Sequence, residues 1–544
     1  MKITNLDKQV SVSDQITVSD LNELSTAGVE ILVCNRPDKE SAEQTDFNEI
    51  ETAAKALGME AIHIPFTAGK MTEEQQKQFS DLLNSGKTVH AYCRTGNRSS
   101  NIWNAVNSEV QNVSENDSVS SAEGVTPNQQ NSSGKPSYDV VVVGAGSGGI
   151  AVSSSLLKRN PSLRIAIVDP STEHFYQPGW TMVGGGIFDA NTTRKETRNL
   201  IPNGVKWIQQ SVTEFSPENN KVQLSDNSEL YYHQLVVSPG LKLNWSGIEG
   251  LEETLGKNGV TSNYRYDLAP YTWQLVQNLR SGKALFTQPP MPIKCAASPQ
   301  KALYLSADHW HKKGLINDID INFHNAGGVL FGVEAYVPAL MSYMQKYQTN
   351  IHFMQTLTKV DGEQKKAWFK SKDEEGNDQI TTSDFDMIHV CPPQCAPDFI
   401  RESELSDDAG WLDVDQNTLQ HKKYANIWGL GDVMNTPNAK TMAAVRKQAP
   451  VVAQNISDTM LSKKPGAGYD GYGSCPLTVE AGKIVLAEFA YGGKLAPTFP
   501  EWVIDGTKPT KLAWILKSKI LPAIYWHGML KGREWLASPL KNQS

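Results

Sequence analysis

The stretch Tyr138-Asp-Val-Val-Val-Val-Gly-Ala-Gly-Ser-Gly-Gly-Ile150 decides the fold of most of this chain. It predicts a buried strand, a tight turn with Gly144, Gly146 and Gly149 at Gly-x-Gly-x-x-Gly spacing, and the start of a helix. Glycines at these positions allow the turn and the close approach of the backbone to a pyrophosphate. The next predicted strand ends on Asp169, whose carboxylate can accept hydrogen bonds from ribose hydroxyls. The sequence therefore predicts a Rossmann-type domain that binds a dinucleotide.

Two further segments favour FAD over NAD as that dinucleotide. Asn426-Ile-Trp-Gly-Leu-Gly-Asp432 resembles the stretch of two-dinucleotide-domain flavoproteins in which an aspartate meets the ribityl chain. This resemblance implies that Gly431 and Asp432 bind the cofactor. Leu235-Val-Val-Ser-Pro-Gly240 resembles the crossover of the same proteins, although most of them have Ala-Thr-Gly there, and it adds Gly240 to the predicted cofactor site.

The middle of the same unit separates two kinds of electron donor. An enzyme that takes electrons from NAD(P)H should carry a second glycine fingerprint after a strand there, whereas residues 319–332 have the strand without the fingerprint. Cys295 in Met-Pro-Ile-Lys-Cys and Cys475 in Gly-Ser-Cys-Pro-Leu offer another route. A dithiol that closes beside a flavin ring exchanges two electrons with it. Neighbouring cations such as Lys294 or Lys301 would lower the pKa of a cysteine.

From Tyr138 onward the chain resembles the sulfide:quinone oxidoreductase family, in the branch that includes the mitochondrial enzymes. Departures from the family pattern are minor, such as Ala297 and Ser298 after the first cysteine. The motifs that carry the resemblance extend over nearly all of this unit and are His174-Phe-Tyr-Gln-Pro-Gly-Trp180 with Gly184-Gly-Gly186, Pro292-Ile-Lys-Cys295 with Pro299-Gln-Lys301, Phe331-Gly-Val333, Gly410-Trp-Leu-Asp-Val-Asp415 with Thr418-Leu-Gln-His421, and Tyr469-Asp-Gly-Tyr-Gly-Ser-Cys475.

The resemblance implies an FAD enzyme that oxidises sulfide to sulfane sulfur and passes the electrons to membrane quinone. Hydrosulfide would attack the disulfide of Cys295 and Cys475, or its polysulfide-bridged form, so that Cys475 carries the persulfide and Cys295 attacks the flavin. The sulfur would leave to a small thiol, sulfite or a similar acceptor. Further cofactor-binding residues implied by the matching motifs are Gln177, Pro178, Trp180 and Lys301. Two alternatives stay open: an NAD(P)H-dependent quinone or disulfide reductase, and a non-catalytic flavin redox sensor.

The first part of the chain predicts a separate α/β domain. Residues 29–34 and 88–92 read as buried strands, and residues 20–27 and 72–83 as helices. The second strand runs into Cys93-Arg-Thr-Gly-Asn-Arg98-Ser-Ser100 and then a helix-compatible segment. A loop that opens a helix at the end of a strand stabilises an anion, so Cys93 is a candidate nucleophile, with Arg94 and Arg98 as oxyanion ligands.

These residues resemble a family with a tyrosine-phosphatase-like fold that is called β-lactamase-hydrolase-like. The matching motifs are Cys34-Asn-Arg-Pro-Asp38 and His90-Ala-Tyr-Cys-Arg-Thr-Gly-Asn-Arg-Ser99. Phosphatases of this fold separate cysteine and arginine by five residues, whereas Cys93 and Arg98 are separated by four, which is closer to rhodanese loops that hold a sulfane sulfur. Sulfur transfer is therefore favoured over phosphatase activity, and a degenerate docking domain remains an alternative. Cys34 is predicted to be a buried small hydrophobe.

The sequence predicts an α/β protein, and composition and motifs divide its chain into several parts. Residues 1–110 form the predicted phosphatase-like sulfurtransferase domain, and 138–500 two interleaved Rossmann-like domains of the disulfide-reductase flavoprotein kind. Residues 111–137 contain no aromatic side chain and many Ser, Asn and Gln, so a disordered linker is predicted. Residues 501–544 form a C-terminal amphipathic segment.

The C-terminal segment is predicted to touch a membrane. Between residues 511 and 535 apolar and aromatic side chains alternate with the cations Lys511, Lys517, Lys519, Lys531 and Arg533. Two short amphipathic helices, broken near Pro522, would lie in the interface with Trp and Tyr at the headgroup level. Packing onto the flavin unit is the alternative.

Charge and cysteine usage exclude other classes of function. A net charge of -8 argues against a nucleic-acid partner. Cys391 and Cys395 lack the second pair that structural zinc would require, so no metal site is predicted. Residues 1–7 lack the apolar segment of a signal peptide, and we expect a bacterial cytoplasmic protein bound peripherally to the inner face of the cytoplasmic membrane. A homo-oligomer is compatible with the sequence.

Overall fold

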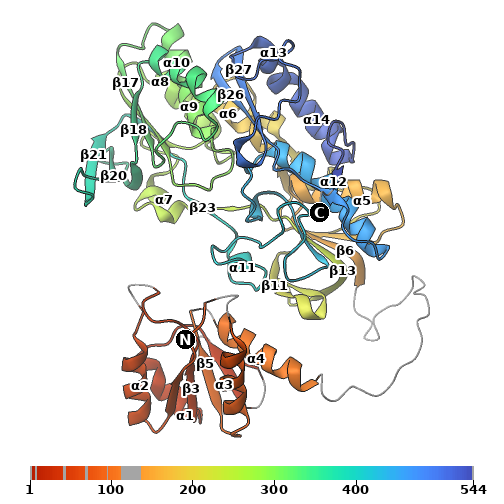
Figure 1. Ribbon diagram of the computed structural model, residues 1–544. Coiled ribbons are helices and arrows are strands. Elements are labelled where there is room, and N and C mark those ends of the chain that lie inside the picture. Colours follow the sequence, from red (N-terminus) through yellow and green to blue (C-terminus); the bar gives the residue numbers. More distant parts are fainter. Residues whose placement is uncertain are drawn as a thin grey trace. The chain divides into compact units, whose positions relative to one another are not determined.

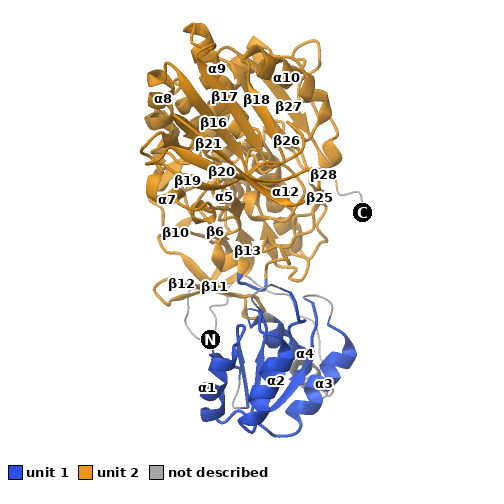
Figure 2. Ribbon diagram, turned by 90° about the vertical axis from the view of Figure 1, so that its left-hand side faces the viewer, with its two compact units in different colours: residues 1–129, 402–404 blue, residues 130–401, 405–544 orange. Residues whose placement is uncertain are grey.

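The chain forms two compact units in a computed structural model that describes residues 3–6, 9–40, 44–67, 71–94, 96–111 and 137–541. Unit 1 comprises residues 1–129 with 402–404, and unit 2 comprises residues 130–401 with 405–544 (Figure 2). Apart from its two end positions, the predicted linker 111–137 lies outside the described residues. The α/β fold class predicted from the sequence is confirmed.

Unit 1 is a five-stranded sheet with helices on both faces (Figure 1). Its strand order is β1-β2-β5-β3-β4, in which only β1 runs antiparallel to its neighbour. Successive side chains of β3 point to opposite faces, so Leu32 and Cys34 join one core while Ile31 and Val33 join the other. The strands are β1 Ile3–Asn5, β2 Val10–Ser13, β3 Ile31–Cys34, β4 Glu60–His63 and β5 Val89–Tyr92. The helices are α1 Leu21–Thr26, α2 Phe47–Ala56, α3 Glu73–Leu83 and α4 Asn97–Gln111.

The predicted strand and glycine turn of unit 2 lie in a seven-stranded sheet. The order is β10-β7-β6-β13-β12-β11, with β24 pairing β13 as well. In β6, Val140 to Val143 are buried, because helices cover both faces of the parallel part of the sheet. The strands are β6 Ser137–Val143, β7 Ile165–Val168, β10 Lys206–Ile208, β11 Val212–Ser216, β12 Lys221–Leu224, β13 Glu229–Val237 and β24 Ile427–Gly429, and the helices are α5 Ser147–Arg159 and α12 Met442–Met460, which pack together.

A second sheet of five parallel strands has the order β15-β22-β16-β17-β18. The strand predicted at 319–325 is present as β17, and a loop without a glycine fingerprint follows it. The elements of this region are β15 Val260–Thr261, β16 Gly282–Gln288, β17 Ile319–Asn325, β18 Asn350–Phe353, β22 Met387–His389, α6 Trp180–Gly184, α8 Ala269–Asn278, α9 Ser298–Lys312 and α10 Val337–Lys346. A smaller antiparallel sheet contains β19 Thr356–Asp361, β20 Lys366–Lys372 and β21 Asp378–Asp384.

The hairpin of β26 Gly473–Glu480 and β27 Lys483–Phe489 packs against α9. Cys475, Leu477 and Val479 alternate along β26 and enter the same core as Leu303 and Ala307 of α9. Since Cys295 precedes α9 directly, this packing brings the two halves of the predicted dithiol together across a long stretch of sequence.

The C-terminal segment is α13 Lys511–Ile515, a π-helical turn η10 Leu516–Ile520 and α14 Leu521–His527. The two short helices predicted from the sequence are α13 and α14, and the predicted irregularity near Pro522 is the π turn that ends at Ile520. Pro522 itself lies in the first turn of α14, where a helix tolerates proline. Across the part of the chain that is described, we find no helix with the length and apolarity needed to cross a bilayer.

Candidate active site

The glycine turn after β6 is packed too closely for side chains at two of its glycines, whereas the third faces open space that a ligand could fill. Gly144 has a φ of 99°, and a Cβ there would lie 2.6 Å from the carbonyl oxygen of Ser238. A Cβ on Gly149 would lie 1.8 Å from the carbonyl oxygen of Gly144, whereas a Cβ on Gly146 would meet no atom within 4 Å. Gly144 and Gly149 therefore serve the packing of turn, helix and strand, and Gly146 leaves the backbone open to a cofactor.

Asp169 holds the same turn from the end of β7. Its carboxylate accepts hydrogen bonds from the backbone N–H of Ala145 at 2.6 Å and of Ser171 at 2.8 Å. Burial raises the pKa of Asp169, and these two bonds oppose the rise. The side chain is partly exposed. It therefore shapes the turn, in addition to the ribose contact that the sequence predicts.

A cavity of about 360 Å³ lies beside this turn. Trp180 and Asn263 line it, and their buried indole Nε1 and side-chain amide have no hydrogen-bond partner among the described residues. A glycine cradle and unpartnered polar atoms fit FAD. The predicted site residues that line the cavity are Gly146, Gln177, Pro178, Trp180, Gly240, Gly431, Asp432, Cys295 and Lys301. The structure places Gly144, Gly149, Asp169 and Cys475 behind this lining.

Cys295 and Cys475 meet at the wall of the cavity. Both are free thiols, and their side chains share a hydrogen bond. Cys475 is buried on β26, whereas Cys295 is half-buried and lies in the loop between β16 and α9. The φ of Cys295 is 50°, a left-handed conformation that is rare for a side chain with a Cβ and costs about 1–3 kcal/mol. The surrounding structure holds this conformation through hydrogen bonds from the N–H of Cys295 to Lys440 and from the N–H of Ser298 to Cys295.

The two thiols differ in their charge. The hydrogen bond from Cys475 lowers the pKa of Cys295 well below its usual range, and Lys301 and Lys517 add to the effect against the cost of burial. The Nζ of Lys301 lies 3.0 Å from the Sγ of Cys295. The same hydrogen bond and burial raise the pKa of Cys475 well above its usual range. Lys301, placed beside Cys295, therefore favours the thiolate on Cys295 rather than on Cys475.

Lys517 and Tyr525 are site residues that the sequence did not reveal. The π turn points Lys517 inward, where its buried Nζ donates to the carbonyl oxygen of Pro178 at 3.0 Å. The hydroxyl of Tyr525 in α14 meets His174 Nε2 at 2.5 Å and the hydroxyl of Ser147 at 2.8 Å. In the sequence Lys517 looked like one more cation of an interfacial helix. The π turn that buries it is visible only in the structure, and such turns often mark functional sites.

Lys517 should give the wild-type protein a pH dependence near neutrality. Burial, with repulsion from Lys301, lowers the pKa of Lys517 to about 7, so its charge is present below that pH and is lost above it. The charge stabilises the thiolate of Cys295. We expect Lys517→Met to slow reduction of the flavin by sulfide, the substrate that the resemblance implies, about tenfold at pH 6 and much less at pH 8.5, since a nearby cation is worth about one pKa unit. The rates are measured by stopped flow, and the ratio of wild type to variant is compared at each pH. The ionisation of sulfide affects both proteins equally and cancels in this ratio. A ratio that does not change with pH would contradict this role.

Cys391 and Cys395 lie on or next to β23, Gln394–Cys395, in the same unit. Cys391 is buried, and burial raises the pKa of its thiol to about 12, so it stays protonated. Cys395 is half-buried. Within the described ranges, no group of three or more His, Cys, Asp or Glu side chains is arranged to hold a metal ion.

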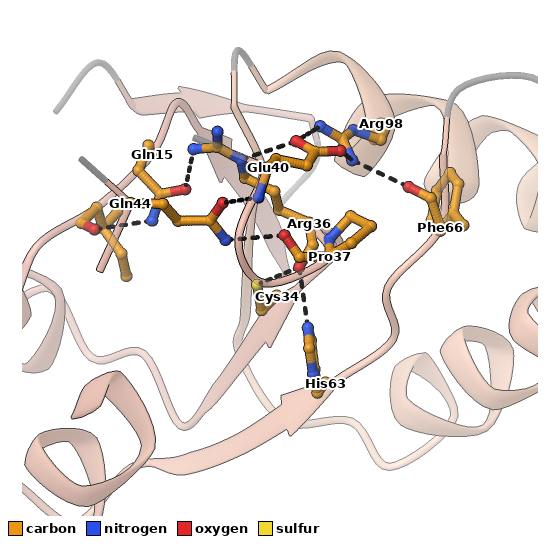
Figure 3. Close-up of polar contacts among 10 residues, drawn as sticks. Gln15, Cys34, Arg36, Pro37, Glu40, Gln44, His63, Phe66 and Arg98 are labelled. Carbon is orange, nitrogen blue, oxygen red and sulfur yellow. Dashed lines mark hydrogen bonds and ion pairs between the residues drawn. The ribbon is translucent and has the colours of Figure 1, made fainter. Parts of the chain in front are cut away.

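Unit 1 brings the Cys93 loop beside the loop that follows β3, because β3 and β5 are paired. Cys93 is buried, and Arg94 is exposed. Arg98, in the first turn of α4, donates to both oxygens of Glu40 at 2.8 and 2.7 Å (Figure 3). The second arginine at this carboxylate is Arg36, and not Arg94, with its Nε 2.9 Å from Glu40. Arg36 stood in a matching motif but was not predicted as a site residue.

Comparisons with known proteins match different families to unit 1 and to unit 2. Residues 2–109 match the family described as "Beta-lactamase hydrolase-like protein, phosphatase-like domain", and residues 138–277 the family described as "Pyridine nucleotide-disulphide oxidoreductase". The chain is 41% identical to the mitochondrial sulfide:quinone oxidoreductase of Dictyostelium discoideum over 397 residues, 72% of this chain and 86% of that protein. It is 37% identical to the mitochondrial sulfide:quinone oxidoreductase of Mus musculus over 398 residues, 73% and 87% of the two chains.

A solved structure shares the fold of unit 2. It is the sulfide:quinone oxidoreductase from the hyperthermophilic bacterium Aquifex aeolicus, with a TM-score of 0.61 at 18% identity over 73% of this chain and 92% of that chain. Fold and cavity thus define an FAD flavoenzyme of the pyridine nucleotide-disulphide oxidoreductase class, and the prediction of FAD is confirmed. The identity to the two mitochondrial enzymes narrows this class further. The chain belongs to the sulfide:quinone oxidoreductase family and oxidises sulfide with quinone as electron acceptor. Family membership decides against the NAD(P)H-dependent reductase and the redox sensor.

The predicted location is wrong. The sequence suggested the inner face of a bacterial cytoplasmic membrane, but the relatives at 41% and 37% identity are both named mitochondrial and come from eukaryotes. The prediction rested on residues 1–7, and the lack of a secretory signal there does not distinguish between these two compartments.

Proposed function

We propose that sulfide is oxidised at Cys295 and Cys475. In the oxidised pair, hydrosulfide attacks the Sγ of Cys475. The bond between the two cysteines breaks, a sulfur–sulfur bond forms on Cys475, and Cys295 leaves as a thiolate. Transfer of the outer sulfur to an acceptor, which can be a second hydrosulfide, leaves a dithiol, whose closure to the disulfide releases two electrons. FAD, held at the glycine turn beside the pair, would supply the acceptor for these electrons and the link to quinone.

The residues around the pair support this division of roles. A thiolate leaves more readily when a cation stabilises it, and Lys301 lies 3.0 Å from Cys295, with Lys517 as a second cation of the cavity lining. The single observation that carries the proposal is this asymmetric pair, stabilised as one thiolate and one thiol, at the wall of a cavity that begins at the glycine turn.

Absorbance of the flavin tests the proposal directly. Under anaerobic conditions we expect sulfide to bleach the flavin of the wild-type protein, a short-chain quinone to restore the colour, and NADH to do neither. The cysteine requirement is tested by the variant described in the Discussion. Bleaching by sulfide that persists without the cysteine pair would place the chemistry elsewhere.

We also propose that Cys93 of unit 1 accepts the sulfane sulfur. The fit of residues 2–109 to a phosphatase-like family and the shorter spacing between Cys93 and Arg98 support a loop that holds a persulfide. Since both units are on one polypeptide, the transfer is intramolecular and acts at a raised effective concentration.

Cys93→Ser should lower the rate of sulfane-sulfur release to small acceptors about tenfold or more at limiting acceptor, because the tethered route is lost. Cys395→Ser, in unit 2, is the matched control and should change nothing. Release of thiosulfate from sulfite and of persulfide from a thiol are measured separately. Equal rates in the Cys93 variant and the wild type would refute the transfer role.

Contact with a membrane is the third part of the proposed function. The C-terminal segment exposes Leu512, Ile515 and Ile520, and Trp502 nearby is 87% exposed. Leu516, Leu521 and Ile524 of the same segment line the cavity. A lipid-soluble quinone could pass between these two sets of side chains. Apolar exposure flanked by cations supports an interfacial position rather than a span.

Replacing Leu512 and Ile515 by glutamate should weaken sedimentation of the protein with anionic phospholipid vesicles about tenfold or more, since two buried side chains are worth roughly 3 kcal/mol. Leu461→Glu, at an exposed position that follows α12, is the matched control. Turnover with a water-soluble quinone should be unchanged. Undiminished vesicle binding by the double variant would contradict the assignment of this surface.

A further inference from the structure

Glu40 of unit 1 carries a carboxylate on which two arginines converge (Figure 3). Arg98 binds it with both Nη atoms, and Arg36 adds its Nε at 2.9 Å. Two guanidinium groups against one carboxylate leave this cluster with an excess positive charge. Three N–H donors aimed at two oxygens of one anion are the arrangement by which proteins recognise carboxylates and oxyanions.

Both arginines have anchors that do not depend on Glu40. Arg98 Nη1 also donates to the carbonyl oxygen of Phe66 at 3.0 Å, and Arg36 Nη1 donates to Gln15 Oε1 at 2.8 Å. The side chains of Arg36 and Arg98 are 4% and 11% exposed, whereas that of Glu40 is 27% exposed. The carboxylate is therefore the member of the cluster that can leave toward solvent, and the guanidinium groups would stay in place.

The cluster lies at the candidate nucleophile. Arg98 is in the first turn of α4, directly after the Cys93 loop, and Arg36 follows β3, the strand paired with β5. The neighbouring Ser99 hydroxyl is buried and has no hydrogen-bond partner among the described residues. The first turn of α4 and the two guanidinium groups together form a site for an anion with several oxygens.

We propose that Arg36 and Arg98 bind a sulfur oxyanion, with sulfite as the acceptor of the sulfur on Cys93, and that Glu40 is a built-in competitor for this site. This proposal rests on the proposed sulfur transfer at Cys93. The sulfur lone pair of sulfite attacks the outer sulfur of the Cys93 persulfide. The persulfide bond breaks, Cys93 leaves as a thiolate and thiosulfate forms. The outer sulfur moves without a net change in electrons, so no other oxidant is needed.

The two possible roles of Glu40 predict opposite changes in oxyanion affinity when its charge is removed. If Glu40 only positions the arginines, its removal weakens oxyanion binding. If Glu40 occupies the site, Glu40→Gln frees it, because a state open for about one tenth of the time lowers the apparent affinity about tenfold. Sulfate is an unreactive analogue of thiosulfate, and acetate represents carboxylate ligands. Calorimetric titration of the full-length holoenzyme with each anion, at ionic strength held constant with chloride, distinguishes these cases.

We expect Glu40→Gln to bind sulfate about tenfold more tightly than the wild type, and Arg98→Lys in the same background to lose the gain. Glu51→Gln, which removes a carboxylate paired with Lys55 in α2 of the same unit, is the matched control and should leave sulfate binding unchanged. Weaker or unchanged binding in the Glu40 variant would overturn the competition. Acetate binding as tight as sulfate binding would overturn the choice of an oxyanion.

The experiments distinguish failure of the proposed oxyanion site from failure of the proposed sulfur transfer, because sulfate binding requires no reaction at Cys93. Normal transfer by Cys93 with no gain of sulfate affinity in Glu40→Gln would overturn the oxyanion site alone. Tighter sulfate binding with thiosulfate formation unchanged in Cys93→Ser would overturn the transfer alone.

Discussion

Replacing Cys475 by serine is expected to lower the rate at which sulfide reduces the flavin by about a thousandfold or more. Serine has nearly the shape of cysteine, but its oxygen can form neither the disulfide with Cys295 nor a persulfide. The core around β26 should tolerate the change, since only one buried atom is exchanged. The loss therefore measures the chemistry of the sulfur atom and not the stability of the hairpin.

The experiment is a stopped-flow measurement of flavin absorbance after mixing the FAD-loaded variant with sulfide. Cys395→Ser serves as the control, since Cys395 is a half-buried free thiol that lies outside the cavity lining. We expect it to keep the wild-type rate. A Cys475 variant that reduces its flavin within a factor of ten of the wild type would remove the dithiol from the mechanism.

Gly149→Ala should strongly weaken the binding of FAD. The new Cβ would lie 1.8 Å from the carbonyl oxygen of Gly144, which is backbone and cannot rotate away. The turn or helix α5 must therefore shift, and forcing atoms into a packed site costs about 3 kcal/mol. Since every 1.4 kcal/mol is a tenfold change, the affinity for FAD should fall about a hundredfold or more.

The amount of flavin per chain after purification, and after titration with added FAD, checks this expectation. Gly466→Ala is the control, because a Cβ there would meet its nearest atom at 3.6 Å, an ordinary contact. Circular dichroism distinguishes loss of FAD from loss of the fold. Wild-type flavin content in the Gly149 variant would mean that the turn adapts and that the glycine is not required for packing.

Local patterns predicted much of unit 2. The valines of β6 are recognisable because a parallel strand buried on both faces is a continuous apolar run, and the glycine spacing reflects a local turn. In unit 1, β3 and β5 lie within the predicted strands, but β2, β4 and α2 were not predicted. These elements are short, and nothing local distinguishes them from loops.

The sequence by itself determined which residues can do redox chemistry. Cys295, Cys475 and Lys301 stand in motifs whose residue types suit sulfur and flavin. Only the tertiary structure decided which of the two thiols carries the charge, because that depends on the hydrogen bond between them and on Lys301 lying 3.0 Å from one sulfur. Protonation is set by neighbours in space, and the packing of β26 on α9 supplies those neighbours.

The same reason explains Lys517 and Glu40. Lys517 is one of several cations along an amphipathic segment, and only the π turn at 516–520 makes it a buried group of the cavity. Glu40 acquires its role only because β3 and β5 are adjacent, which brings Arg36 and Arg98 to one carboxylate. A linear pattern shows which side chains are available. Long-range packing decides which of them meet, because electrostatic and hydrogen-bond energies depend on distances that close only when the chain is folded.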